Sequence, residues 1–154
     1  MTKVEETIDV AVPVRTAYNQ WTQFEEFPRF MEGVKQVRQV DDTHLEWQAN
    51  VGGREQSWRA EITEQTPDQR VAWVSTSGAH NAGVVNFHYL EPERTAVSVT
   101  MEVEPPAGAV GNAADSALGV TARRVKGDLE RFKEFIESRG SETGAWRGEV
   151  SKHN

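Results

Sequence analysis

The sequence between residues 34 and 104 alternates apolar and polar side chains almost without interruption, and this pattern constrains the fold more than any other feature. Turn-forming residues break the alternation at regular intervals, namely Asp41-Asp42, Gly52-Gly53, Pro67-Asp68, Gly78 to Ala82 and Pro92-Glu93. A period of two indicates strands with one buried face, and paired glycines between two such runs are a strong signal for a tight hairpin. We therefore expect strands near residues 34–40, 43–51, 54–65, 69–77, 83–91 and 94–104.

No helix-length segment separates these strands, so consecutive antiparallel pairing into a meander is the simplest topology. A further strand is expected at the N-terminus, where the apolar residues between positions 4 and 10 share one parity. Pro13 suits the first turn of a helix, and we expect a short helix over residues 15–22 after it. A second short helix or turn is expected over residues 24–31.

A long helix is predicted from about residue 110 to residue 138, because small and apolar side chains recur there at helical spacing. Gly140 follows as a stop signal, and a helix of this length spans about 43 Å. The stripe has small residues in its first half and large ones in its second: Gly111, Ala114, Leu118, Thr121, Val125, Leu129, Phe132 and Ile136. The order of elements predicts an α+β fold, in which a seven-stranded curved antiparallel sheet wraps around a long C-terminal helix and two short helices follow the first strand.

The chain has 154 residues, the size of one domain. We expect this domain to cover residues 1–139 and the glycine-rich residues 140–154 to form a flexible tail. Trp146 is the unusual residue of this tail, and we expect it to dock on a groove, to cover the mouth of a pocket or to contact a partner chain. The oligomeric state is not defined by the sequence.

Composition and charge exclude several classes of protein. The absence of cysteine rules out disulfides, thiolate catalysis and Cys-ligated zinc. A net charge of −7 argues against binding to nucleic acid or to anionic membranes. No apolar run is long enough to span a membrane and the acidic N-terminus lacks a signal-peptide pattern, so we expect a cytoplasmic protein without integral membrane association. The four histidines lack metal-site spacing, and we expect neither a metal nor a cofactor.

The side of the predicted sheet that faces the long helix is rich in aromatic residues. Strand parity places Trp47, Trp58 and Trp73, three of the five tryptophans, on this side. The small residues in the first half of the helix either let it approach the sheet closely, as in an ordinary packed core, or leave a space lined by aromatic rings. Such a space suits a flat or extended apolar ligand. The candidate ligand-binding residues are Phe30, Trp47, Trp58, Trp73, Phe87, Met101, Ala114, Leu118 and Thr121.

Four motifs, together with the long C-terminal helix, carry a family resemblance. They are Trp21 with Phe24-Glu25-Glu26-Phe27-Pro28-Arg29-Phe30-Met31, Trp47 before Val51-Gly52-Gly53, Trp58 with Ile62-Thr63-Glu64, and Trp73-Val74-Ser75-Thr76-Ser77-Gly78. Over residues 3–139 the chain resembles the polyketide cyclase/dehydrase and lipid-transport family of the START-like (SRPBCC, helix-grip) superfamily. The closing residues 144–149 are similar to a tail of bacterial members. The resemblance implies a deep ligand cavity, and the family includes aromatase/cyclases, coenzyme Q-binding proteins and carriers of lipids or hormones.

Three function hypotheses follow. The preferred one is a protein that binds an apolar small molecule, such as a polyketide, a quinone or a lipid, between the helix and the sheet. The first alternative is a polyketide cyclase or dehydratase of the aromatase type, which acts without a cofactor on a poly-β-ketone in that cavity. The second alternative is a non-catalytic module that recognises another protein.

A cyclase needs a base, an acid and donors for an enolate oxygen. The inward parity supplies few such groups, because its polar members are Gln56, Ser75, Tyr89 and Thr121. The resemblance points to Arg59 with Tyr89 or Tyr18 as weak catalytic candidates, since cyclases of the family often place an Arg and a Tyr in the cavity. Arg59 follows Trp58, however, so its parity directs it outward. The pattern therefore favours binding over catalysis.

Overall fold

The computed structural model describes residues 2–31, 33–51, 54–78, 81–103, 112–146, 148 and 150. For residues 2, 51, 54, 103 and 112–121 the description is limited to the backbone. The elements along the chain are β1 (Thr2–Val10), α1 (Val14–Trp21), the 3-10 helix η1 (Phe24–Arg29), β2 (Val34–Gln39), β3 (His44–Val51), β4 (Arg54–Thr66), β5 (Arg70–Gly78), β6 (Asn81–Glu91), β7 (Arg94–Val103) and α2 (Asn112–Arg139).

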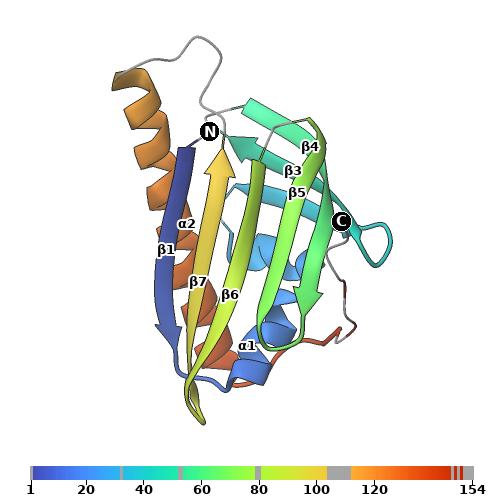
Figure 1. Cartoon of the computed structure of the whole chain (residues 1–154), viewed down its shortest axis with the longest axis vertical. Helices are drawn as coiled ribbons and strands as arrows, with labels where there is room; N and C mark the ends of the chain where they lie inside the picture. The colour runs from blue at the N-terminus through green and yellow to red at the C-terminus, as the bar shows by residue number, and fades with distance from the viewer. Residues whose placement is uncertain are drawn as a thin grey trace.

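The strands form one seven-stranded antiparallel sheet in the order β1-β7-β6-β5-β4-β3-β2. Strands β2 to β7 pair with their neighbours in sequence, and β1 closes the far edge beside β7, as Figure 1 shows. Helix α2 lies on one side of this sheet, with α1 on the same side at one end. We call the side that α2 covers the inner face and the opposite side the outer face. The predicted α+β fold, with its strand meander and two short helices, is confirmed.

The second half of α2 seals one end of the inner face. Its large side chains are buried, and Phe132 packs edge-on against Trp21 of α1, with ring centroids 5.0 Å apart. Phe30, which follows η1, also contacts the Phe132 ring at 5.3 Å. Contacts between aromatic rings of this kind add to the gain from burying their area. They anchor both short helices to α2. Helix α2 ends at Gly140, which has a φ of 73° and donates its N–H to the carbonyl of Ile136.

A β-bulge changes the face of strand β4 near its end. The register between β4 and β5 shifts between Ile62 and Glu64. Before the shift, Ile62 faces the core and is 1% exposed. After the shift, the opposite parity faces the core, so Gln65 is 1% exposed. Both polar atoms of the Gln65 side-chain amide are buried without a hydrogen-bond partner among the described residues.

The chain beyond α2 returns across α1 toward β4. The backbone N–H of Thr143 donates to the side chain of Gln20 at 2.8 Å, and the Gln20 amide donates to the Thr143 hydroxyl at 3.0 Å. Further along, the backbone N–H of Trp146 donates to the Thr22 hydroxyl. Val150 forms an isolated antiparallel bridge with Gln65. The division of the chain at residue 139 into a domain and a flexible tail stays a prediction.

Candidate functional site

The candidate site lies on the inner face, where three tryptophans are only half-buried. Trp47 on β3 and Trp58 on β4 are direct cross-strand partners, and their rings are stacked with centroids 5.6 Å apart and planes 9° apart. Trp47 also contacts Phe27 of the core at 5.7 Å between ring centroids, which fixes the side of the sheet on which the pair lies. The indole Nε1 of Trp47 is buried and has no hydrogen-bond partner among the described residues.

Trp73 on β5 lies on the same face, where its cross-strand partner is Ile62, four residues along β4 from Trp58. Its indole N–H donates to the side-chain oxygen of Asn81 at 3.0 Å, which orients the ring along the sheet toward β6. There the ring covers Gly83, and Met101 of β7 is the next residue in the same row across the sheet. Trp73 and Met101 are both half-buried and pack against the core. The half-buried side chains on the inner face of β3, β4, β5 and β7 are therefore apolar at these positions, namely Trp47, Trp58, Trp73 and Met101.

Two other candidate ligand-binding residues belong to the core. Phe30 is 2% exposed and Phe87 is 5% exposed, and both lie within the cluster of buried aromatic and aliphatic side chains. The first half of α2 is the element expected to complete the site. The side chains of Ala114, Leu118 and Thr121 lie outside the described part of the chain. The roles of all nine candidates in ligand binding stay predictions.

The three weak catalytic candidates do not meet. The Arg59 side chain is 70% exposed on the outer face and pairs with Glu46 at 3.2 Å. Tyr89 is 63% exposed at the end of β6, beyond the core. Tyr18 is fully buried, and its ring packs edge-on against Phe87 with centroids 5.4 Å apart. These residues therefore occupy three separate environments, and no catalytic site is assembled from them.

Glu6 is an ionisable residue on the inner face that was not predicted from the sequence as a candidate site residue. Glu6 lies on the same side of β1 as the buried Val4 and Val10, opposite Val99 of β7, and is half-buried. It has no hydrogen bond or ion pair to any residue in the described part of the chain. The period of two in residues 4–10 places Glu6 inward, so the signal was present in the sequence.

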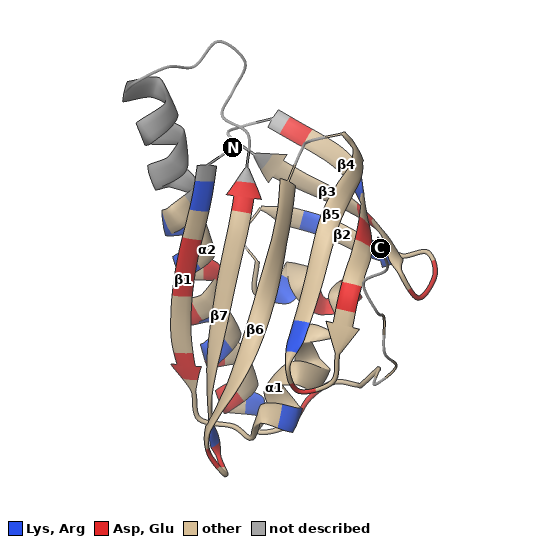
Figure 2. Ribbon diagram, in the orientation of Figure 1, with Lys and Arg blue, Asp and Glu red and all other residues tan. Residues whose placement is uncertain are grey.

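Charged groups elsewhere are mostly solvated. Figure 2 shows that β5, β6 and β7 carry few charged residues, whereas β1 and α2 carry many. The groups with shifted pKa values lie away from the tryptophans, as with Asp41, whose pKa is lowered by hydrogen bonds from the Thr43 N–H and from His44. Within the described ranges, no three His, Asp or Glu side chains gather in a way that could hold a metal ion. No described helix is long and apolar enough to cross a membrane.

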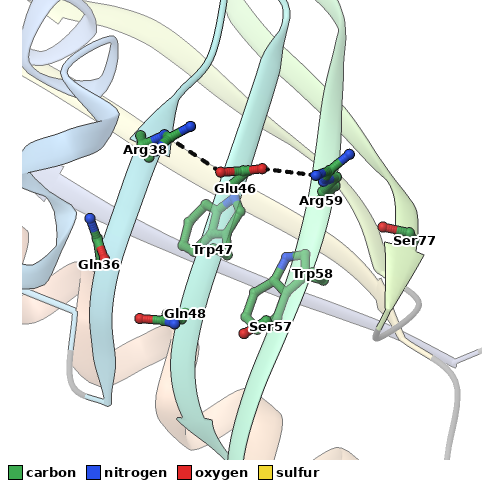
Figure 3. A pocket seen from close by; sticks show the side chains of 9 residues that line it. All are labelled: Gln36, Arg38, Glu46, Trp47, Gln48, Ser57, Trp58, Arg59 and Ser77. Carbon is green, nitrogen blue, oxygen red and sulfur yellow. Dashed lines mark ion pairs between the residues drawn. The ribbon is translucent and has the colours of Figure 1, made fainter.

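A separate hollow of about 380 Å³ lies over β2 to β5. Its charged lining is Arg38, Glu46 and Arg59, which stand in one row across three adjacent strands (Figure 3). These residues alternate with Val37, Trp47 and Trp58, whose side chains face inward, so the hollow opens on the outer face. Trp47 and Trp58 also contribute to its lining. Strands β3 and β4 thus carry an apolar aromatic surface on one side and a polar groove on the other.

The long helix on the inner face of a curved antiparallel sheet, with an aromatic surface between them, defines the helix-grip fold. The sequence matches the family described as "Polyketide cyclase / dehydrase and lipid transport" over residues 10–130. The chain belongs to this family. It is also 54% identical, over 97% of its length and 99% of the relative, to an uncharacterized 17.2 kDa protein from the melC2-rnhH intergenic region of Streptomyces lincolnensis.

Solved structures share the fold at low sequence identity. A protein of Thermus thermophilus is similar with a TM-score of 0.77 and 20% identity, covering 91% of this chain and all of that one. The Zhui aromatase/cyclase of Streptomyces sp. R1128 has a TM-score of 0.76 at 17% identity, covering 94% of this chain and 99% of the other. A START superfamily protein of Mycobacterium smegmatis has a TM-score of 0.71 at 16% identity, with coverages of 89% and 95%. The expected family and fold are confirmed.

Proposed function

We propose that this protein binds an apolar small molecule between the inner face of the sheet and the first half of α2. The observation that carries the proposal is the group formed by Trp47, Trp58 and Trp73, which are half-buried although they lie on the face that α2 covers. Tryptophans in a finished core are more completely enclosed, as Trp21 is at 6% exposure. Family membership supports the same proposal, because the family's description includes lipid transport.

The stacked pair favours a ligand with a flat, conjugated part. The Trp47 and Trp58 rings are stacked with planes only 9° apart, so a flat ring that packs on the outer face of either one extends the same stack. The Trp47 indole N–H has no partner among the described residues but is buried, so the ring would have to turn toward the ligand before this group could donate to a carbonyl oxygen. An aromatic polyketide or a quinone combines both features, and a lipid supplies only the apolar surface.

The expected affinity is moderate. A ligand that buries about 300 Å² of apolar surface gains roughly 7.5 kcal/mol at about 25 cal/mol/Å². The loss of translational and rotational freedom and the ordering of side chains cost several kcal/mol. We therefore expect micromolar binding when few polar anchors are present.

Native mass spectrometry tests the proposal. The protein is purified without detergent, and its mass is compared before and after incubation with a quinone, a fatty acid and an aromatic polyketide. A stoichiometric adduct that is lost in the Trp47→Ala/Trp58→Ala double variant supports the proposal. Adduct formation that the double variant retains, or a mass that stays that of the bare chain with every ligand, contradicts it.

A second candidate function is cyclisation or dehydration of a poly-β-ketone. The observation in its favour is Glu6, a half-buried carboxylate without a partner among the described residues, diagonal to Met101 in the β1–β7 pairing. A carboxylate in an apolar surrounding can act as a general base. The test is loss of water from a linear poly-β-ketone, followed by mass spectrometry. Turnover that disappears in Glu6→Gln, with ligand binding retained, supports catalysis, and equal turnover in both proteins removes Glu6 from this role.

A further inference from the structure

The polar groove on the outer face lies on the opposite side of the sheet from the proposed ligand site. Its charged row consists of Arg38 on β2, Glu46 on β3 and Arg59 on β4. The Nε of Arg38 lies 3.5 Å from one carboxylate oxygen of Glu46, and an Arg59 nitrogen lies 3.2 Å from the other, as the dashed lines in Figure 3 show. Two guanidinium groups therefore share a single carboxylate.

Most of the donors in this row have no protein partner among the described residues. A guanidinium carries five N–H donors in a planar fork that matches a carboxylate. The side chains of Arg38 and Arg59 are 63% and 70% exposed, and each is directed by one contact to Glu46 only. The row carries a local charge of +1 in a chain whose net charge is −7. An incoming anion thus meets a local positive charge in this row, and the next row along β4 carries the acidic Glu61.

A second row on the same face is polar and uncharged. Gln36, Gln48 and Ser57 are paired across β2, β3 and β4, two residues along each strand from the charged row. This row lies about 7 Å from the charged row, because a strand rises about 3.4 Å per residue. All three side chains are exposed, and none has a hydrogen bond to another described residue. Amide and hydroxyl groups of this kind pair with peptide N–H and C=O groups.

The dimensions of the groove fit a short extended peptide. The charged row continues to Ser77 on β5, the cross-strand partner of Arg59, so the groove crosses four strands. Four strands cover about 14 Å, which is the length of about four extended residues. Acidic side chains at positions i and i+2 of an extended chain are about 7 Å apart, within reach of both arginines, and the side chain of the residue between them points away from Glu46.

We propose that this groove binds an acidic peptide segment of a partner protein, with two carboxylates on Arg38 and Arg59 and the peptide backbone on the row of Gln36, Gln48 and Ser57. A peptide fits better than a small free anion. Single ion pairs at exposed positions contribute little, so useful affinity requires several contacts made at once. Glu46 pairs with both arginines and competes with an incoming carboxylate for them, which limits the affinity for anions.

The test is an NMR titration of the full ¹⁵N-labelled chain with a capped pentapeptide in which glutamates alternate with serines. The matched peptide with glutamine in place of glutamate is the ligand control. Binding of the acidic peptide with shifts at the amides of β2, β3 and β4, and a loss of affinity as salt is raised, supports the proposal. The absence of shifts, or equal binding of the glutamine peptide, overturns it.

Variants make the test specific. The Arg38→Gln/Arg59→Gln double variant is expected to bind at least about fivefold more weakly, and Glu46→Gln about threefold more tightly, because a charge that repels the peptide is removed. Lys35→Gln is the matched control, since Lys35 also lies on β2, pairs with Glu55 at 2.8 Å and lies outside the groove lining. If Lys35→Gln weakens binding as much as Arg38→Gln does, only the net charge matters and the proposal fails.

Two further measurements distinguish peptide binding in the groove from binding of a free dicarboxylate and from binding at the inner face. Succinate tests whether an isolated dicarboxylate is enough, and binding as tight as that of the peptide would overturn the peptide assignment. A quinone, as a probe of the inner face, is titrated into the same arginine variants. Loss of peptide binding with unchanged quinone binding shows that the groove is a site of its own. If the quinone binds neither protein, the proposed function fails, and the peptide titration still tests the groove.

Discussion

The ring of Trp73 lies directly over Gly83, its cross-strand partner on β6. A Cβ atom placed on Gly83 would come within 2.7 Å of two atoms of the indole ring and of the Thr100 carbonyl oxygen. Glycine at this position is therefore what lets the ring lie flat along the inner face, and the geometry of the proposed ligand site depends on it.

Gly83→Ala should displace the Trp73 ring. The backbone carbonyl of Thr100 cannot move away easily, so the strand pair or the ring must shift, and we expect a loss of about 1–3 kcal/mol in the free energy of unfolding. Chemical denaturation measures it. Binding of the apolar ligand should fall as well. A variant of unchanged stability would show that the ring relocates without strain.

Trp47→Ala should weaken binding of the apolar ligand by about tenfold, because one face of the stacked pair is lost and an aromatic contact contributes roughly 1–1.5 kcal/mol. The dissociation constant is measured by fluorescence titration. Trp146→Ala is the control, since the Trp146 ring packs over Gly148 in the C-terminal segment. Equal effects of the two substitutions would remove Trp47 from the site.

Glu137 should give a pH-dependent contribution to stability. Desolvation, the largest single effect, opposes its ionisation, but hydrogen bonds from Lys133 and from the Ala11 N–H together lower the pKa of this carboxyl. A lowered pKa in the folded state means that the stabilisation is present at neutral pH and is lost as the pH falls through and below the ordinary range of glutamate.

Glu137→Gln should therefore be less stable than the unmodified protein by about 1 kcal/mol at pH 7. The difference should shrink as the pH falls below the ordinary range of glutamate. Urea titrations at several pH values measure it, and a difference that is independent of pH would contradict the assignment. Glu134→Gln, on an exposed position of the same helix, is the control.

Gln65→Met should raise the free energy of unfolding by about 1 kcal/mol. The Gln65 side chain is 1% exposed, and its amide atoms have no partner among the described residues, whereas a methionine of similar length avoids that desolvation cost. A thermal melt compares the two proteins. A lower melting temperature would mean that the amide is satisfied in solution.

Removal of residues 141–154 should lower the melting temperature by several degrees. The deletion removes the contacts of Thr143 with Gln20 and of Trp146 with Thr22, and it leaves these two buried polar side chains at the end of α1 exposed to water. Hydrogen exchange at the α1 amides should increase. An unchanged melt and unchanged exchange would support the expectation of a merely flexible tail.

The sequence predicted the fold closely because each of its elements carries a clear period. The strand expected over residues 43–51 is β3, and the helix expected over 110–138 is α2, with ends that differ by one or two residues. Simple parity failed where a bulge or a chain end intervenes. Gln65 is buried because the register shifts after Ile62, and Tyr89 is exposed although its parity points inward, because it lies beyond the core.

The candidate site was harder to predict. Parity correctly placed Trp47 and Trp58 on the inner face, but it carries no information on how completely a ring is enclosed. The outer groove was missed because it arises from the cross-strand register of Arg38, Glu46 and Arg59, which lie far apart in the sequence. A single sequence does not specify such a register before the strands are paired.

The docked C-terminal segment also changes how this sheet meets other chains. Pairing between β3 and β4 ends at Glu61, so the last residues of β4 extend past their neighbour and present an open edge. On that edge, the Gln65 N–H donates to the Val150 carbonyl at 2.8 Å, and the Gln65 carbonyl accepts from the Val150 N–H at 2.9 Å. Open strand edges are templates for aggregation. The segment beyond α2 thus occupies backbone groups that would otherwise be open to pairing with a strand of another chain.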